Sequence, residues 1–205
     1  RAVVPYCYRY SHRREKTSES LTILFVAGFA HPPNEDAARF LVEDILPLVQ
    51  HQYPDARVLL VGSHPTAAVK ALAGPSVEVT GWVSDNHLQD YYETSRVAVV
   101  PLRFGAGVKG KVVEALHYGL PLVTTSIGVE GIEELETIIC VSDSAQDIAN
   151  DIMKLFSDGE RWLAQSWAQT EFSTKHFSFE AMRHSLQNAL FPEQSQIGQV
   201  ERVGE

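Results

Sequence analysis

The chain alternates short, nearly continuous apolar runs with longer segments in which apolar residues recur every three or four positions. Continuous runs of this length are typical of strands buried on both faces, and the longer spacing is typical of helices with one buried face. Because the two kinds alternate, the pattern predicts an α/β fold with a doubly wound parallel sheet and helices on both faces. The predicted strands are residues 21–28, 57–62, 77–81, 97–102, 121–125 and 137–142.

The helices predicted between and after these strands begin and end at recognisable signals. Asn34 is expected to cap the first helix, and Pro47 to bend it or end it early. Gly74 and Gly119 are expected to close the second and fourth helices, and Ser178 to cap the last. The predicted helices cover about residues 34–49, 65–74, 86–95, 108–119, 144–157, 159–171 and 178–190.

Composition changes at both ends of this alternation. Residues 1–20 turn polar and charged after a short apolar start, so we interpret them as a linker or interdomain segment, with any strand at its very beginning. Residues 21–191 form the expected domain, and residues 192–205 a polar, frayed tail. Within the domain, large aromatic side chains are expected to serve the core or helix packing: Phe25, Phe40, Trp162 and Trp167.

Charge and cysteine content narrow the class of protein. The formal net charge of −9 over 205 residues argues against a sequence-independent nucleic-acid surface, which would be basic. Cys7 and Cys140 lie far apart in the sequence, which predicts two free thiols in a reducing, cytoplasmic compartment. No apolar run approaches the length of a membrane span, no signal peptide is recognisable, and the first residue is Arg1, which suggests a fragment of a longer protein.

The most informative stretch is RFGAGVKGKVVEALHYG, residues 103–119. Three glycines in six residues (Gly105, Gly107 and Gly110) leave the backbone N–H groups open to close approach by a ligand, and the pattern then becomes helical. A glycine-lined turn that begins a helix favours anions. Lys111 and Glu114 share one face of this helix, where the lysine could offset diphosphate charge and the carboxylate could accept hydrogen bonds from ribose hydroxyls.

Two interpretations of this stretch stay open from the residues alone. It is either a nucleotide site, or a tight structural turn followed by a solvated Lys–Glu pair worth only a few tenths of a kcal/mol. Its position favours the first, because ligands of doubly wound sheets bind outside the carboxyl ends of the strands. Four turns follow strands and should meet at that edge: Gly28, Gly62, Gly81 and residues 105–107.

The order PLRFGAGVKGKVVEALHYGLPLVTTSIGVEG, preceded by GWVSDNHLQDYY, resembles the donor-binding half of family 4 retaining glycosyltransferases. VAGFAHPPNEDAARFL and LLVGSHP fit a subgroup with a PN pair after the first strand. The resemblance covers about residues 21–190 and implies one Rossmann-like half of a GT-B fold, as the carboxy-terminal domain. The acceptor-binding domain of such an enzyme is not part of this sequence.

The resemblance also implies roles for individual residues. Lys111 and Glu114 match the catalytic diphosphate-binding lysine and the ribose-binding glutamate. The expected donor-binding set is Gly28, His31, Val83, Leu88, Arg103, Gly105, Ala106, Gly107, Val108, Lys111 and Glu114. Within it, Val83 and Leu88 match positions that flank the base, and the backbone of Gly107 and Val108 completes the diphosphate cradle.

The sequence departs from this pattern at two points. Many members carry a second glutamate eight residues before the Glu114 position, where this chain has Ala106. Many also carry Arg after the first-strand glycine, where this chain has Phe29, so that His31 is the only possible cation in that loop. Diphosphate binding would then depend on Lys111 with help from Arg103 or Lys109.

The resulting hypothesis is the donor-binding domain of a retaining, hexosyl-type glycosyltransferase. The implied partners are a UDP- or GDP-sugar and an acceptor (a sugar, a lipid-linked sugar or another group) held by the rest of the protein, which would also make any peripheral membrane contact. The resemblance implies no cofactor and no dedicated metal, and no Cys/His cluster has the ligand spacing of a zinc site. Two alternatives remain: a sugar-nucleotide 2-epimerase on the same fold, and a non-catalytic nucleotide-binding module. The isolated fragment is expected to be inactive.

Overall fold

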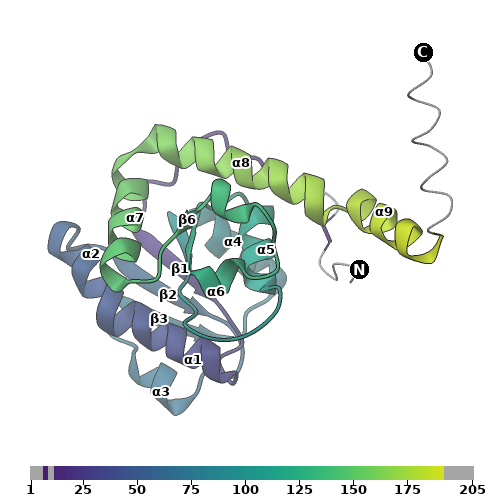
Figure 1. Cartoon of the computed structure of the whole chain (residues 1–205). Coiled ribbons are helices and arrows are strands. Elements are labelled where there is room, and N and C mark those ends of the chain that lie inside the picture. The colour runs from purple at the N-terminus through teal and green to yellow at the C-terminus, as the bar shows by residue number, and fades with distance from the viewer. Residues whose placement is uncertain (1–6, 9–11, 192–205) are drawn as a thin grey trace.

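A computed structural model describes residues 7–8 and 12–191. Its sheet contains six strands in the order β3-β2-β1-β4-β5-β6, and all neighbouring strands run parallel (Figure 1). The doubly wound, Rossmann-like α/β fold is therefore confirmed. The strands are β1 (Thr22–Val26), β2 (Arg57–Val61), β3 (Val77–Gly81), β4 (Val97–Val100), β5 (Leu122–Thr124) and β6 (Cys140–Val141).

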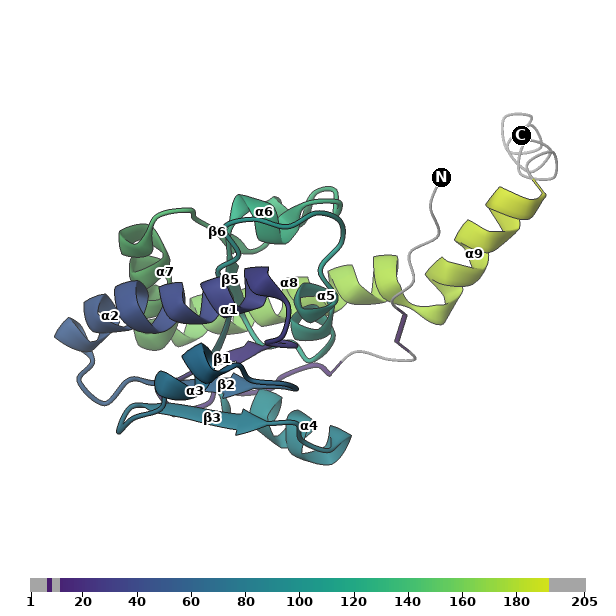
Figure 2. The same ribbon diagram turned by 90° about the horizontal axis from the view of Figure 1, so that it is seen from below.

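The helices alternate with these strands and continue after β6. The chain winds outward from the centre of the sheet in two directions, from β1 toward β3 and from β4 toward β6. Because crossovers between parallel strands are right-handed, the helices of these two halves lie on opposite faces. Figure 2 shows the sheet between helical layers. The helical elements are α1 (Pro32–Arg39), the π-helix η1 (Phe40–Ile45), α2 (Leu46–Gln52), α3 (Ala67–Ala71), α4 (Asp85–Thr94), α5 (Gly110–His117), α6 (Ser126–Val129), the 3₁₀ turn η2 (Leu135–Thr137), α7 (Ala145–Ser157), α8 (Gly159–Phe177) and α9 (Phe179–Leu190).

The start of the first helix differs from the prediction. His31 is the N-cap, and Pro32 and Pro33 occupy the first positions of α1, where a missing N–H costs nothing. Asn34 therefore lies inside the helix and is not its cap. Pro47 does not end the helical run either, because the π-helical segment before it closes with a bond from Leu46 N to Leu41 O and α2 then continues to Gln52.

The predicted end of α8 near residue 171 is also wrong, since the helix runs on to Phe177. Its buried face is largely polar, which hides the apolar period on which the prediction rested. The Gln169 amide, for example, accepts from Leu122 N at 2.9 Å and donates to Leu120 O at 2.8 Å. Trp162 is in the core as expected, whereas Trp167 is 41% exposed.

The segment before β1 is packed against the domain. The Arg14 guanidinium donates to the carbonyl oxygens of Tyr92, Glu93 and Tyr118. Ser18 and Ser20 hydroxyls donate to the Thr94 carbonyl. The role of residues 1–20 as a link between domains stays a prediction, and the strand expected at the very start and the tail at residues 192–205 lie outside the described residues.

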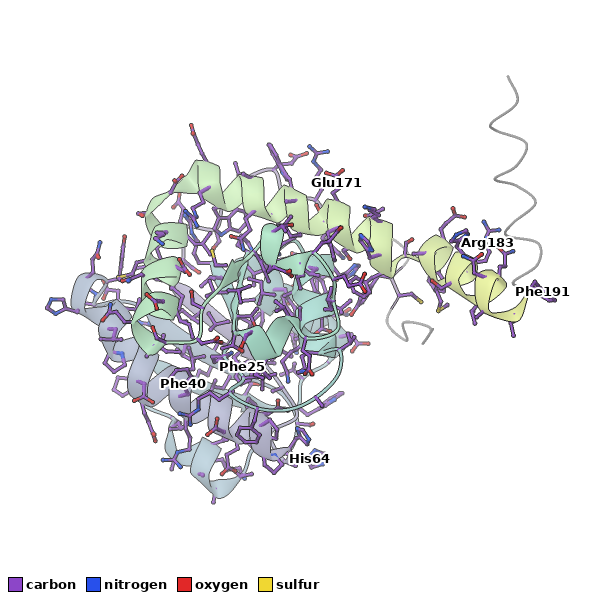
Figure 3. The ribbon with its side chains drawn as sticks, in the orientation of Figure 1. Phe25, Phe40, His64, Glu171, Arg183 and Phe191 are labelled. Carbon is purple, nitrogen blue, oxygen red and sulfur yellow. The ribbon has the colours of Figure 1, made fainter. Side chains whose placement is uncertain are left out.

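At the other end, α9 projects away from the body of the molecule, as the labelled side chains of Arg183 and Phe191 show in Figure 3. Ser178 caps this helix as predicted, accepting from Ala181 N at 3.1 Å. Both cysteines are free thiols. Over residues 7–8 and 12–191, no helix is both long enough and apolar enough to span a bilayer.

Replacing Gly119 should destabilise the fold. Its φ is +59°, and an added Cβ would lie 2.7 Å from the His12 carbonyl oxygen and 2.8 Å from Thr170 Cγ2. Gly119→Ala should therefore lower the free energy of unfolding by about 2 kcal/mol, from left-handed backbone strain together with the overlap. Gly74→Ala is the control, because nothing lies within 4 Å of its added Cβ. Equal unfolding midpoints in urea for the two variants would contradict this account.

Candidate functional site at the reversal of the sheet

The site lies where the strand order reverses. β1 and β4 are neighbours at the centre of the sheet, so the loop after β1 and the glycine-rich turn after β4 leave the same edge. Gly105 and Gly107 have φ angles of +124° and +77°, conformations that side chains other than glycine rarely adopt. A Cβ on Gly105 would lie 3.8 Å from Pro33, so the turn passes close to the start of α1.

Lys111 lies in the first turn of α5 and points toward the first turn of α1. Its Nζ donates to Asn34 Oδ1 at 2.6 Å and lies 5.8 Å from the centre of the Phe25 ring. Burial, with a smaller contribution from the nearby Lys109 charge, lowers the pKa of Lys111 to about 8. The ammonium group is thus held by a neutral oxygen in a partly desolvated place.

Glu114 lies one turn further along α5 and has a different partner. Its Oε2 accepts a hydrogen bond from the Tyr92 hydroxyl of α4 at 2.9 Å. Burial raises the pKa of Glu114, and the bond from Tyr92 opposes that rise. Burial, together with the Glu114 charge, raises the pKa of Tyr92 well above its ordinary value, so the hydroxyl keeps the proton that it donates. A solvated Lys111–Glu114 pair does not fit these contacts.

The other two cations of the turn already have carboxylate partners. Arg103 Nε donates to Asp36 Oδ2 at 2.8 Å, and its guanidinium lies over the Phe40 ring. Lys109, the N-cap of α5, lies 3.2 Å from Glu130 Oε2 and also donates to the Gly107 carbonyl. The help that the sequence suggested from Arg103 or Lys109 would therefore require either side chain to exchange partners.

The remaining predicted residues line the same edge at differing depth. Gly28, His31, Gly105, Ala106 and Gly107 are exposed, and the Gly28 carbonyl accepts from the Asn34 amide at 2.8 Å. Three others are half-buried and pack against the core: Val83, Leu88 and Val108. The Tyr92–Glu114 bond connects the helix of Leu88 to α5. The structure thus brings together the loop after β1 and the turn at residues 103–114.

Two polar residues of this site were missed as site residues from the sequence. The sequence pattern predicts Asn34 as a cap, although the two prolines before it indicate an earlier helix start. Tyr92 is buried on the inner face of α4, and the partner of its hydroxyl depends on the crossing of α4 and α5, which no local pattern indicates. The loops at this edge also carry two exposed aromatic side chains, Trp82 and Phe104. Within the described ranges, no group of three or more His, Cys, Asp or Glu side chains could hold a metal ion.

Comparison with known proteins identifies the family to which this chain belongs. The family model described as glycosyl transferases group 1 matches residues 20–158. A curated protein of Klebsiella pneumoniae, described as an uncharacterized 44.6 kDa protein in the cps region, is 28% identical over 116 residues. That match covers 53% of this chain and 30% of the relative's length.

Solved structures of glycosyltransferases share the fold. TarM superposes with a TM-score of 0.73 at 14% identity, over 89% of this chain and 37% of that one. HepE of Anabaena, solved in complex with UDP and glucose, superposes with a TM-score of 0.69 at 14% identity. The match covers 84% of this chain and 48% of HepE. The pneumococcal O-GlcNAc transferase GtfA, solved in complex with UDP and GlcNAc, superposes with a TM-score of 0.69 at 14% identity. The match covers 90% of this chain and 38% of GtfA. The chain therefore spans less than half of each, consistent with one half of a GT-B fold.

Removing the Tyr92 hydroxyl should raise the pKa of Glu114 further. The hydroxyl donates to the charged carboxylate and so favours its ionised form, while burial acts in the opposite direction. We expect Tyr92→Phe to shift the Glu114 titration to higher pH in a carboxyl carbon NMR experiment. Tyr91→Phe, one position earlier on the same helix, should leave it unchanged. An unshifted titration in Tyr92→Phe would mean that the bond contributes nothing in solution.

Proposed function

Since the chain belongs to the glycosyl transferases group 1 family, we propose that it is the donor-binding domain of a retaining glycosyltransferase. The whole enzyme would transfer a sugar, of hexosyl type, from a nucleoside diphosphate sugar to an acceptor. The acceptor would be held by the remainder of a longer protein. The UDP complexes of HepE and GtfA support a UDP-sugar as the first donor to test.

One observation carries this proposal: the two side chains matched to donor binding are half-buried beside neutral partners. Lys111 contacts the Asn34 amide, and Glu114 contacts the Tyr92 hydroxyl. Among the described residues, neither forms a salt bridge. A purely structural pair would satisfy its charges internally, because unpaired charge is costly to bury. An anion near Lys111 and hydroxyl donors near Glu114 would supply the missing interactions.

The proposed mechanism is electrostatic. The diphosphate lies on the glycine-rich turn, where the N–H groups at the start of α5 and the Lys111 ammonium stabilise the charge that develops as the sugar leaves. Glu114 accepts hydrogen bonds from the ribose hydroxyls and thereby fixes the position of the nucleotide. Each role uses a residue of this chain, and neither requires a metal ion held by the protein.

Ala106 favours a second candidate function. This exposed position carries no carboxylate, whereas the resemblance implies a glutamate that contacts the donor sugar in many members of the family. A non-catalytic module that binds a nucleotide would need Lys111 and Glu114 but not a carboxylate here. Sugar transfer by the complete protein separates the two candidates, since a binding module would show none. In either case we expect residues 1–205 alone not to transfer sugar, because the proposed donor-binding domain would lack the partner domain that holds the acceptor.

We predict that a nucleoside diphosphate raises the melting temperature of this chain, because a ligand that binds only the native state stabilises it. UDP, GDP and ADP should be compared at millimolar concentration. The affinity should fall as the pH rises above about 8, because Lys111 must then take up a proton to bind an anion. The absence of a shift with all three nucleotides would contradict the proposal.

We further predict that two variants separate charge binding from ribose binding. Lys111→Ala should weaken UDP much more than uridine, because the lysine acts on the diphosphate charge. Glu114→Ala should weaken both by about tenfold or more, since hydrogen bonds to charged groups contribute about 1.5–3 kcal/mol each. Lys154→Ala is the control, because it removes the same charge from an exposed position on α7. Calorimetry on folded variants measures all affinities, and unchanged binding in both variants would exclude this site.

A further inference from the structure

We propose that Asn34 is the positioning residue for the diphosphate-binding lysine, and that its neutrality is essential to that role. It directs the Lys111 ammonium group without cancelling its charge, so that an incoming diphosphate meets an uncompensated cation. This inference rests on the proposed function of Lys111. It goes beyond that function because it assigns a role to Asn34, a neutral residue.

The Asn34 side chain is buried, with 7% exposure, and both ends of its amide are used. Nδ2 donates to the Gly28 carbonyl oxygen at 2.8 Å, and Oδ1 accepts from Lys111 Nζ at 2.6 Å. A carbonyl oxygen can only accept and an ammonium group can only donate, so the two partners together determine which way the amide faces. Asparagine meets both demands at once, which neither a carboxylate nor an alkyl side chain can do.

Asn34 also connects the two halves of the sheet. Gly28 follows β1, and Lys111 lies in the helix that follows β4, the neighbouring strand on the other side of the reversal. The amide therefore spans the place where ligands of doubly wound sheets bind. Because α1 begins at Pro32 and not at Asn34, the amide projects from within a regular helical turn whose backbone is fixed.

The charges around the turn show why a neutral acceptor matters. Arg103 pairs with Asp36, and Lys109 pairs with Glu130. Lys111, the third cation of residues 103–111, has the Asn34 amide in the place of a carboxylate. An aspartate there would complete a third ion pair and leave little net charge for an anionic ligand. The amide keeps the ammonium group oriented but does not offset the free energy that its partial desolvation costs. A bound diphosphate would offset that cost.

Two variants that differ in charge separate this role from a structural one. Asn34→Ala and Asn34→Asp both lose the bond to the Gly28 carbonyl, but only Asn34→Asp adds a negative charge beside Lys111. If Asn34 only anchors the loop after β1, both should weaken UDP alike. If neutrality is essential, Asn34→Asp should weaken UDP about tenfold more than Asn34→Ala, with uridine affinities that agree within about threefold.

The pH dependence gives a second readout that a structural role would not move. Asn34→Asp should raise the Lys111 pKa above the parent value of about 8, and the fall in UDP affinity should move to higher pH with it. Asn34→Ala should not raise that pKa. Titration of the lysine ε-methylene NMR signals measures it in the free protein, with Lys111 assigned by its absence in Lys111→Ala. Circular dichroism and melting curves establish that each variant is folded.

The outcomes distinguish this inference from the function on which it rests. If the parent chain binds none of the nucleoside diphosphates, the proposed function is wrong, and the role of Asn34 in it is wrong as well. If the parent binds UDP but the two Asn34 variants weaken it equally, the donor site stands and the inference is overturned. An unchanged Lys111 pKa in Asn34→Asp would overturn it too, because the amide and the ammonium group would then not be in contact.

Discussion

The candidate site depends on the pairing of β1 with β4 at the centre of the sheet. This pairing reverses the direction in which the chain winds, so the helices that follow the two strands leave toward opposite faces. The space between them receives the loop after β1, the glycine-rich turn and the start of α5. Residues from parts of the sequence that are far apart, such as Asn34 and Lys111, come into contact only because of this arrangement.

Burial shifts the pKa values of Lys111 and Glu114, the two charged residues of α5, in opposite directions. It lowers the pKa of Lys111 and raises that of Glu114, so each is destabilised in the form that a nucleotide would need. The neutral partners Asn34 and Tyr92 fix the geometry without removing this cost. Such a site is pre-organised: its side chains are already oriented, and their interaction with a ligand remains to be gained.

The sequence predicted the sheet well because its central strands are buried on both faces and therefore appear as continuous apolar runs. It also placed the glycine-rich turn, the start of α9 at Ser178 and the closure of α5 by Gly119. Its errors have physical causes. The buried face of α8 is polar, and the π-helical turn before Pro47 is a tertiary adjustment that no local pattern indicates.

The site was predicted less completely than the fold. Glycines, a lysine and a glutamate at fixed spacing can be recognised along one segment, and Lys111 and Glu114 were found in that way. The residues that orient them come from α1 and α4, and hydrogen bonds between helices have no period in the sequence. Arg103 illustrates the converse, because a cation expected to contact a ligand proves to be paired with Asp36.

The contacts of Arg14 have a mechanical consequence. Its guanidinium joins the carbonyl oxygens at the end of α4, those of Tyr92 and Glu93, to that of Tyr118 at the end of α5. A single side chain thus links the C-terminal ends of the two helices that carry Tyr92 and Glu114. The helix ends cannot separate without breaking hydrogen bonds of Arg14. The spacing of a hydrogen bond inside the domain is therefore set partly by a segment that precedes the first strand.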